Sequence, residues 1–360
     1  MRNPALSHTP CTVLDPYGWS SARVGALPTG THPARVVRHD GASLLAATPD
    51  GLRTLRVPPG LDPPPTVGDW LAVRPPSDAD PDGPRLERVL ERSSLVRRMS
   101  ADGTGSQALA ANVDLVLITC GLDRPVRPGR IHRAAAQAWD ADAHPVLLLT
   151  KAGAPGAVDV DLPRLELEHP GMRVLVTSSQ EGIGLDDVRA LVAGRTAVLV
   201  GESGAGKSTL INALLGRDEV ATGPVREGDA KGRHTTTSRQ LHVLPGSAGG
   251  SIIDTPGIRS LGLFAGSDAV DAAFADIQEL AGACRFGDCR HLSEPGCAVL
   301  AACDSGELVP ARYDSWRRLQ KEVASAAMRS SPHELRKHGR RFGRAAKEGA
   351  ALKRRPAGDV

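Results

Sequence analysis

Short alternating runs of hydrophobic and polar residues characterise the chain from about residue 34 to residue 96. The runs cover 34–38, 43–46, 52–57, 69–73 and 85–90. Turn-forming pairs such as Asp40-Gly41 and Asp50-Gly51 separate them, and about five short strands at this spacing predict a small β-barrel of the OB-fold type. A small β domain without any nucleic-acid role has nearly the same pattern. Residues 1–33 lack clear periodicity, and we expect them to form a loosely attached extension.

The hydrophobic pattern changes near residue 112, where continuous apolar runs begin to alternate with segments of helical periodicity. The strand-like runs are 113–119, 145–150, 173–177 and 197–200, and the helical segments are 129–140, 186–193 and 207–215. Continuous apolar strands are typical of a parallel sheet that helices cover on both faces. The pattern therefore predicts an α/β domain over 97–265, which includes a hairpin-like pair at 239–244 and 251–254.

The C-terminal part of the chain has helical character after about residue 268, with a cysteine-rich interruption. We expect a small helical domain over 266–328 and a basic tail over 329–360. The tail carries 10 Lys and Arg against three Asp and Glu, whereas the whole chain has a formal charge of only +3. Such a segment is typical of contacts with the phosphate backbone of RNA, and a solvated helix face is the alternative.

The overall composition is that of an ordinary multidomain globular protein. The 360 residues are 41% hydrophobic and 24% charged. No apolar run approaches the roughly 18–20 residues that a membrane-spanning helix needs. The N-terminus also lacks the charged and then apolar pattern of a secretory signal. We therefore expect a cytoplasmic protein without a membrane partner.

A phosphate-binding loop follows the apolar run 197–200 and precedes the helical segment 207–215. Its residues match GxxxxGK[ST] and are Gly201, Glu202, Ser203, Gly204, Ala205, Gly206, Lys207, Ser208 and Thr209. The glycines let successive N–H groups point at a β-phosphate, and the helix N-terminus adds its dipole. Lys207 is expected between the β- and γ-phosphates, and the Ser208 hydroxyl is the expected Mg²⁺ ligand. Between a strand and a helix, this loop predicts a nucleoside-triphosphate site.

A second phosphate motif, Asp254-Thr-Pro-Gly257, begins where the last apolar strand ends. In nucleoside triphosphatases an aspartate at this place holds Mg²⁺ through water, and the glycine N–H meets the γ-phosphate. The polar segment 231–237 lies between the two motifs, and a hydroxyl of Thr235 or Thr236 is a candidate to close over Mg²⁺. These segments are the predicted switch I and switch II of a GTPase.

Elements that resemble the base-recognition loop and turn of a GTPase precede the phosphate loop instead of following it. The loop is Thr150-Lys151-Ala152-Gly153, and the turn contains Ser178 and Ser179. The motifs therefore occur in a circularly permuted version of the usual order along a GTPase domain. The run 113–119 supplies the strand that must precede the base loop. A circular permutation of this kind preserves the neighbours within the sheet and moves the termini.

One position departs from the usual [NT]KxD pattern of a base loop. Gly153 stands where an aspartate normally accepts hydrogen bonds from guanine N1 and from the exocyclic amine. Loss of that carboxylate removes a strong source of base discrimination. Asp159 and Asp161 in the following loop are candidates to replace it. Guanine preference otherwise depends on Lys151 packing along the base and on the turn at Ser179.

A cysteine-rich segment has the spacing of a metal site. Cys284, Cys289, His291 and Cys297 form the pattern C-x4-C-x-H-x5-C within 14 residues. Three thiolates and one imidazole match a closed tetrahedral zinc site, and glycines and a proline between them permit tight reversals. Because no open coordination position or nearby general base is evident, we interpret the site as structural. Reduced cysteines in a helical segment are the alternative.

Together these motifs resemble one family, the circularly permuted ribosome small-subunit-dependent GTPases (RsgA, also called YjeQ). The likeness covers about residues 34–325, and its most specific parts are the permuted order, the segment Gly232-Arg-His-Thr-Thr-Thr237 and the cysteine–histidine pattern. The resemblance implies GTP or GDP with Mg²⁺ as nucleotide and one structural zinc. It also implies a monomeric late assembly factor that binds the 30S subunit and its 16S rRNA and hydrolyses GTP in response.

The position directly after the DxxG motif lacks the glutamine with which many GTPases orient the attacking water. Ile258 stands there instead, and isoleucine cannot orient water by hydrogen bonding. We therefore expect slow hydrolysis by the isolated protein. Our hypothesis gives this role to His234 of switch I, acting with Lys207 and Asp254 when the ribosomal subunit orders that loop. The alternative is that His234 is an exposed loop residue without a catalytic role.

Two other functions stay open on the sequence alone. One is a P-loop ATPase or kinase with relaxed base specificity, which competition between GTP and ATP distinguishes. The other is a nucleotide-binding rRNA scaffold without efficient hydrolysis, which phosphate release with and without 30S subunits distinguishes. The intact loop from Gly201 to Ser208 already argues against the scaffold.

Overall fold

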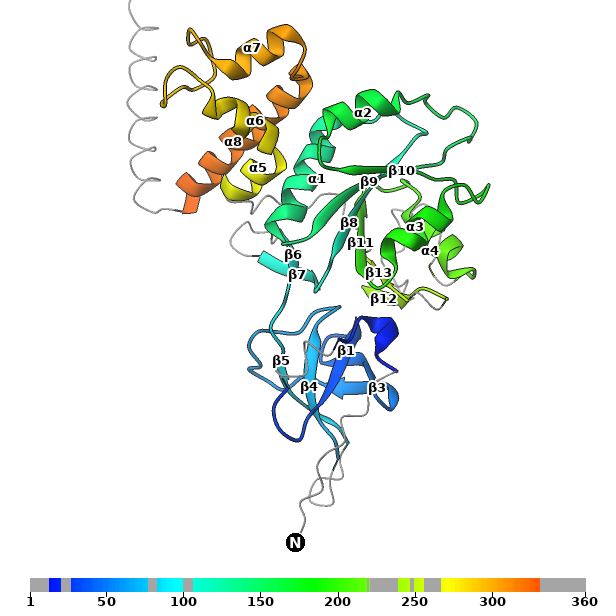
Figure 1. Ribbon diagram of the computed structural model, residues 1–360. Helices are drawn as coiled ribbons and strands as arrows, with labels where there is room; N and C mark the ends of the chain where they lie inside the picture. The colour runs from blue at the N-terminus through cyan, green and yellow to red at the C-terminus, as the bar shows by residue number, and fades with distance from the viewer. Residues whose placement is uncertain are drawn as a thin grey trace, which may run out of the picture.

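The computed structural model shows three parts that follow one another along the chain (Figure 1): a β region, a mixed α/β region and a helical region. It describes residues 13–20, 27–76, 83–99, 106–218, 220, 239–246, 249–255 and 267–330. Among these residues, none of the helices combines the length and the apolar character that crossing a bilayer requires.

The N-terminal β region contains the five strands that the alternating pattern predicts. They are β1 (His32–His39), β2 (Ser43–Thr48), β3 (Gly51–Arg56), β4 (Trp70–Arg74) and β5 (Arg85–Val89). All pairings are antiparallel, and β1 lies between β2 and β4. Their inward side chains form one apolar core that includes Val36, Leu44, Leu55, Leu71 and Leu86. Alternation places every second residue on this core. The opposite faces of β1 and β4 are buried as well, because Val37, Trp70 and Ala72 pack in a second cluster with Leu14.

Part of the N-terminal extension is packed against the β region. The short 3-10 helix Asp15–Tyr17 follows Leu14, which is fully buried. The ring of Trp19 lies 4.8 Å from the ring of Trp70, between centroids, and the Arg35 guanidinium stacks on the Trp70 ring at 4.7 Å. Large aromatic contacts of this kind stabilise a segment that has little secondary structure. The expectation of a loosely attached extension is therefore wrong for residues 13–20.

Six strands at the centre of the α/β region belong to a continuous 11-stranded sheet that also takes in the strands of the β region. They are β8 (Leu115–Gly121), β9 (His144–Thr150), β10 (Arg173–Val176), β11 (Thr196–Gly201), β12 (Gln240–Val243) and β13 (Ser251–Asp254). The spatial order is β10-β9-β8-β11-β13-β12, parallel except for β12. The predicted run 113–119 thus corresponds to β8, which pairs with β9 on one side and with β11 on the other.

Helices cover both faces of this part of the sheet, as the continuous apolar strands predict. The helices are α1 (Pro128–Asp140), α2 (Leu162–Glu168), α3 (Leu185–Val192) and α4 (Lys207–Leu215). Along β8, Val116 and Ile118 pack in the cluster that contains the side chains of α1 and α2. Leu115 and Leu117 pack in the cluster that contains α3 and α4. Side chains that alternate between two buried faces explain why residues 115–118 of this strand are all apolar.

A strand pairing, a short hairpin and a set of polar contacts join the β region to the α/β region. Strand β1 pairs antiparallel with β12, with Arg38 opposite Gln240. The hairpin consists of β6 (Leu95–Met99) and β7 (Ser106–Ala111), which the sequence analysis does not predict. Beyond it, buried Arg35 donates hydrogen bonds to the Asn112 carbonyl at 3.2 Å and to the Thr196 hydroxyl at 3.1 Å. The Asn112 side chain donates to the Gly68 carbonyl at 3.0 Å. These contacts connect the start of β11 to the β region.

The helical region packs on α1 and contains the metal-ligand segment. Its helices are α5 (Ser267–Ala273), α6 (Ala275–Gly282), α7 (Ala298–Ser305) and α8 (Pro310–Ser330). Phe274, Ile277, Val299, Trp316 and Leu319 form its core, which also takes in Ala136 of α1. Two ion pairs reinforce the region, Arg133–Glu322 across to α1 at 2.7 Å and Arg312–Asp276 within it at 2.5 Å. Of the predicted basic tail, only residues 329 and 330 are described, at the end of α8.

Candidate functional site

The phosphate loop lies between β11 and α4, where the sequence pattern places it. The strand ends at Gly201 and the helix begins at Lys207. A β-carbon on Gly201 would lie 2.3 Å from the Thr119 carbonyl oxygen, so the close approach of the loop to β8 requires glycine. Ser208 and Thr209 are the next residues of the helix. The N–H groups at this helix start have no intrahelical acceptor, which suits them to bind an anion.

Lys207 and Asp254 interact electrostatically beyond the carboxyl ends of the neighbouring strands β11 and β13. The Lys207 Nζ donates hydrogen bonds to the carbonyls of Gly201 at 2.9 Å and Glu202 at 2.8 Å. Burial lowers the pKa of Lys207, although the nearby Asp254 carboxylate opposes this shift. Burial likewise raises the pKa of Asp254, against the effect of His242 and Lys207. A desolvated cation beside a desolvated carboxylate suits a site that receives a charged ligand.

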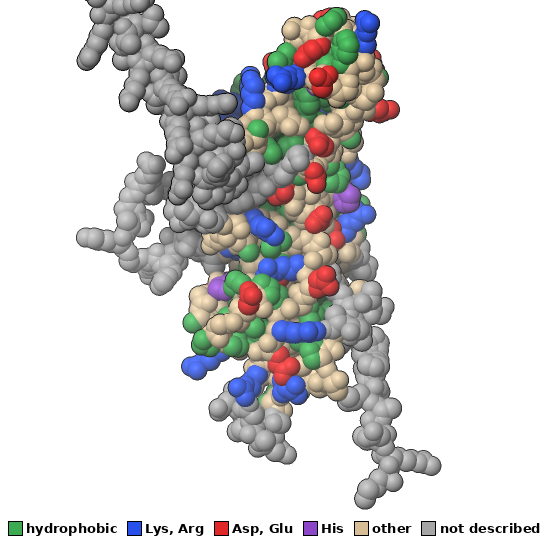
Figure 2. All heavy atoms as spheres, turned by 90° about the vertical axis from the view of Figure 1, so that its left-hand side faces the viewer, with side chains coloured by type: hydrophobic (Ala, Val, Ile, Leu, Met, Phe, Trp, Pro, Cys, Tyr) green, Lys and Arg blue, Asp and Glu red, His purple; other side chains and the backbone are tan. Residues whose placement is uncertain are grey.

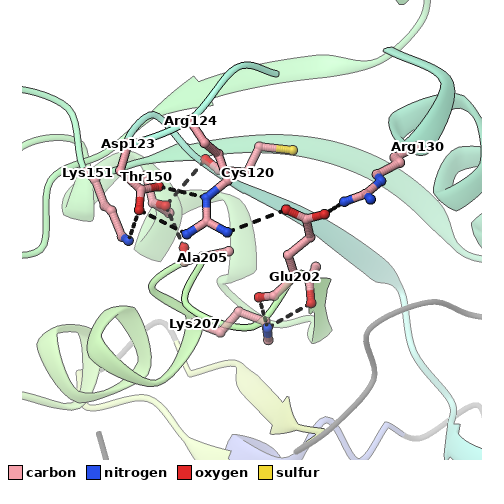
Figure 3. A network of polar contacts seen from close by, with 10 residues as sticks. Cys120, Asp123, Arg124, Arg130, Thr150, Lys151, Glu202, Ala205 and Lys207 are labelled. Atoms are coloured by element: carbon pink, nitrogen blue, oxygen red, sulfur yellow. Dashed lines mark hydrogen bonds and ion pairs between the residues drawn. The ribbon is translucent and has the colours of Figure 1, made fainter. Parts of the chain in front are cut away.

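The base loop touches the phosphate loop, although about fifty residues of sequence separate them. The Thr150 hydroxyl, at the end of β9, donates a hydrogen bond of 2.6 Å to the Ala205 carbonyl. On its other side, the loop is held by the Ala152 N–H, which donates to the Thr177 carbonyl at 3.1 Å. The two motifs that occur in swapped order along the chain therefore meet at one edge of the sheet (Figure 3).

Asp123, which the sequence analysis does not single out, holds Lys151 in place. The Lys151 ammonium lies 2.8 Å from a carboxylate oxygen of Asp123, which follows the end of β8 (Figure 3). Hydrogen bonds from Arg124 and Lys151 lower the pKa of Asp123 to about 2. The carboxylate is therefore ionised at neutral pH and fixes the ammonium at the base loop. The one available sequence signal is its place after a strand that neighbours the base-loop strand.

Glu202 of the phosphate loop is also tied to the segment after β8. Its carboxylate forms ion pairs with Arg124, at 3.6 Å, and with Arg130 at the start of α1 (Figure 3). Glu202 occupies a variable position of the GxxxxGK[ST] pattern, and the pattern therefore assigns it no partner. The two arginines and Asp123 form one polar network with Lys151 and Glu202, and this network bridges the base loop and the phosphate loop.

The turn after β10 lies beside the base loop. Ser178 and Ile183 exchange two backbone hydrogen bonds of 3.0 Å, which close a tight loop over residues 179–182. Ser178 is buried and Ser179 is half-buried. The Glu181 N–H donates a hydrogen bond of 3.4 Å to the Ser178 hydroxyl. Asp161, one of the proposed replacements for the missing base-loop carboxylate, instead accepts a hydrogen bond of 3.1 Å from the Arg164 N–H and caps α2.

Several predicted site residues lie outside the described part of the chain. They are His234, Thr235 and Thr236 of switch I and Gly257 of switch II, together with Ile258. Their roles stay predictions. The adjoining Thr255 is described, and its hydroxyl donates a hydrogen bond of 2.9 Å to the Leu199 carbonyl, which secures the chain where β13 ends.

The cysteine–histidine cluster has the geometry of a tetrahedral metal site. The donor atoms of Cys284, Cys289, His291 and Cys297 all lie within 4.8 Å of one another. The Cys284 sulfur lies 3.6 Å from His291 Nδ1 and 3.9 Å from the Cys297 sulfur. Ligands about 2.1–2.3 Å from a tetrahedral ion are separated by about 3.5–3.8 Å, so the donor set fits zinc. The Tyr313 hydroxyl donates a hydrogen bond to the His291 carbonyl and joins the cluster to α8.

Replacing Thr150 by valine will weaken the contact between the two loops. The variant retains the branched shape but loses the donor, and the Ala205 carbonyl then has no partner in a buried place. We expect the free energy of unfolding to fall by about 1–3 kcal/mol. Urea denaturation measures this change, with Thr54→Val on the exposed side of β3 as the matched control. Equal unfolding midpoints for the two variants would show that the hydrogen bond does not stabilise the site.

The sheet order and the position of the two nucleotide loops define a class of protein. A P-loop after β11, an aspartate at the end of the adjacent β13 and a base loop earlier in the chain are the marks of a circularly permuted P-loop GTPase. Residues 89–264 match the family model described as RsgA GTPase. The chain belongs to this family and is a GTP hydrolase.

Comparison with single proteins supports the same assignment. The chain is 43% identical over 366 residues to the small ribosomal subunit biogenesis GTPase RsgA of Streptomyces coelicolor, a match that covers 97% of this chain and 98% of the relative. The crystal structure of YjeQ from Thermotoga maritima has a TM-score of 0.60 and 22% identity over 82% of this chain and 99% of its own. YloQ, described as a circularly permuted GTPase, has a TM-score of 0.59 and 21% identity over 82% of this chain and 96% of its own. The predicted family and fold class are confirmed.

Proposed function

We propose that the chain binds GTP with Mg²⁺ between the phosphate loop and the base loop and hydrolyses it to GDP and phosphate during assembly of the small ribosomal subunit. The observation that carries this proposal is the hydrogen bond from Thr150 to Ala205, because it puts the swapped halves of a nucleotide pocket at one edge of the sheet. The relatives' shared name, small ribosomal subunit biogenesis GTPase, supports the biological role.

Each side of the pocket has a distinct task in this proposal. Lys207 neutralises charge that develops on the transferred phosphoryl group, and Ser208 with a switch I threonine holds Mg²⁺. Asp254 binds the same ion through water, and Gly257 contacts the γ-phosphate. Lys151 lies along the base, held by Asp123. Bound Mg²⁺ supplies electrostatic stabilisation of the phosphates, and the chain's own residues position it.

The water-orienting group in this proposal is His234. Because Ile258 cannot orient water, the isolated chain is expected to hydrolyse GTP slowly. Binding of the ribosomal subunit would order the switch I segment and bring the imidazole toward the γ-phosphate. This role rests on the sequence alone, since His234 lies outside the described residues.

The helical region has a structural role in the proposal. Zinc bound by the cysteine–histidine cluster would stabilise a segment whose apolar core is small. The basic tail, the β region and this region are proposed to contact the 16S rRNA backbone. Figure 2 shows basic and acidic side chains interspersed among the described residues of one face of the molecule. On this face the described residues do not form a field of one sign. The excess of positive charge lies in the tail sequence, because residues 1–328 have 34 Lys and Arg against 38 Asp and Glu.

A titration of the purified chain with 30S subunits tests the proposed function. Phosphate release from labelled GTP should be slow alone and rise at least about tenfold with saturating subunits, and ATP should not compete. Equal release from ATP would favour a P-loop ATPase or kinase instead. Nucleotide binding without release, with or without subunits, would favour an rRNA scaffold.

A further inference from the structure

The base loop lacks the carboxylate that guanine recognition usually employs, and the structure brings a different carboxylate to that place. We propose that Glu181, from the turn after β10, selects guanine by accepting hydrogen bonds from N1–H and from the exocyclic amine. The inference rests on the proposed GTP site, which it deepens. It assigns base selection to a residue outside the base loop.

The position of the Glu181 carboxylate carries the inference. A β-carbon built on Gly153 would lie 2.8 Å from each of the two carboxylate oxygens of Glu181 and 3.1 Å from its carboxyl carbon. These are the three heavy atoms nearest to that point outside the neighbouring residues. The carboxylate of Glu181 therefore occupies the space into which a side chain at position 153 would extend. Neither Asp159 nor Asp161 comes as close to it.

Backbone hydrogen bonds hold the turn that carries Glu181 close to the base loop that carries Gly153. The turn that carries Glu181 is closed by the paired bonds between Ser178 and Ile183, each 3.0 Å long. The base loop is attached to the start of that turn by the bond of 3.1 Å from the Ala152 N–H to the Thr177 carbonyl. Since β9 and β10 are parallel neighbours, both segments leave the sheet at the same edge. The approach of Glu181 to Gly153 thus follows from the strand order.

Glu181 has acceptor capacity to spare, whereas the carboxylates of Asp123 and Asp161 already have partners. Among the described residues its carboxylate has no hydrogen bond or ion pair, and its side chain is exposed. Asp123 is paired with Lys151 and Arg124, and Asp161 caps α2. An ionised carboxylate presents two oxygens, which match the two adjacent donors on the guanine edge. Adenine has no N1 proton, and xanthine would place an oxygen against the carboxylate.

Binding measurements on Glu181→Gln test the inference. We would titrate GDP, XDP and ADP into the full chain by calorimetry. Wild type should prefer GDP, and the variant should lose about 10- to 100-fold in GDP affinity. It should also gain affinity for XDP, because an amide can donate to the xanthine 2-oxygen. Glu166→Gln, an exposed glutamate of α2 whose side chain has no contact with the base loop, is the matched control.

A second variant keeps the test independent of any effect on folding. In Glu181→Ala/Gly153→Asp the carboxylate moves back to the base loop, where Gly153 has a left-handed φ of +72° that aspartate tolerates better than most residues. This double variant should recover the preference for GDP that Glu181→Ala loses. An unchanged ratio of GDP to XDP affinity in Glu181→Gln would overturn the inference and leave the GTPase proposal intact. A wild-type chain that binds ADP as tightly as GDP would overturn both.

Discussion

Replacing Lys207 by alanine will reduce subunit-stimulated GTP hydrolysis by about two to three orders of magnitude. The Lys207 ammonium is the half-buried cation of the phosphate loop, held 2.8–2.9 Å from two loop carbonyls. In a desolvated pocket a charge of this kind stabilises the developing phosphoryl charge far more than it would in water. Its loss therefore affects the transition state strongly. Nucleotide affinity should also fall, because the phosphates lose their cation.

The fold should survive this change. Lys207 and the two residues whose carbonyls accept from it are only half-buried, so water can replace the hydrogen bonds that the variant loses. Single-turnover phosphate release with 30S subunits measures the effect, and thermal unfolding monitors the fold. Lys321→Ala, on the exposed side of α8, is the control. Hydrolysis at the wild-type rate by Lys207→Ala would refute the assignment of the phosphate loop.

Replacing Cys297 by serine will release the metal and open the helical region. The Cys297 sulfur is buried, lies 3.4 Å from His291 Nδ1, and its residue caps the start of α7. Binding of a structural zinc contributes about 10–16 kcal/mol to folding in small domains. The four ligands lie in a segment between α6 and α7 that the structure describes throughout and that has no helix or strand of its own, so its conformation depends on the metal. We expect the region around α7 to lose protection from amide exchange, while the parallel sheet keeps its protection.

The neighbouring Cys303 supplies the control for this experiment. It lies in the same helix, but its sulfur is not part of the cluster. Elemental analysis should therefore give about one zinc per chain for both wild type and Cys303→Ser. If Cys297→Ser bound the same amount of zinc and kept the same amide protection, the cluster would not be a structural metal site.

The strands of the α/β region could be predicted because each is a continuous apolar run. The run 145–150 corresponds to β9, His144–Thr150, whose residues 145–149 are apolar and buried on both faces of the sheet. Helix α2, Leu162–Glu168, was not predicted, since it is only seven residues long and contains Pro163 in its first turn. The hairpin of β6 and β7 was missed as well, because its strands are short and carry mixed polarity.

Some of the site residues could likewise be predicted from the sequence, and others could not. The phosphate loop and the cysteine–histidine set could be found in the sequence, because each lies within a span of 14 residues or fewer and its spacing alone defines the chemistry. Asp123 and Glu181 could not be found in that way. Asp123 is bonded to Lys151, and the carboxylate of Glu181 lies against Gly153. In both cases the two residues are 28 positions apart along the chain. No local pattern links them.

The amino-acid sequence by itself determined the family, the nucleotide loop, the order of the motifs and the metal ligands. These features depend on neighbours along the chain, whose spacing is visible in the sequence. Only the tertiary structure decided that Thr150 meets Ala205, that Asp123 holds Lys151 and that Glu181 lies against Gly153. The reason is physical: these contacts depend on the lateral order of β10, β9, β8 and β11, which burial of both sheet faces and long-range strand pairing establish.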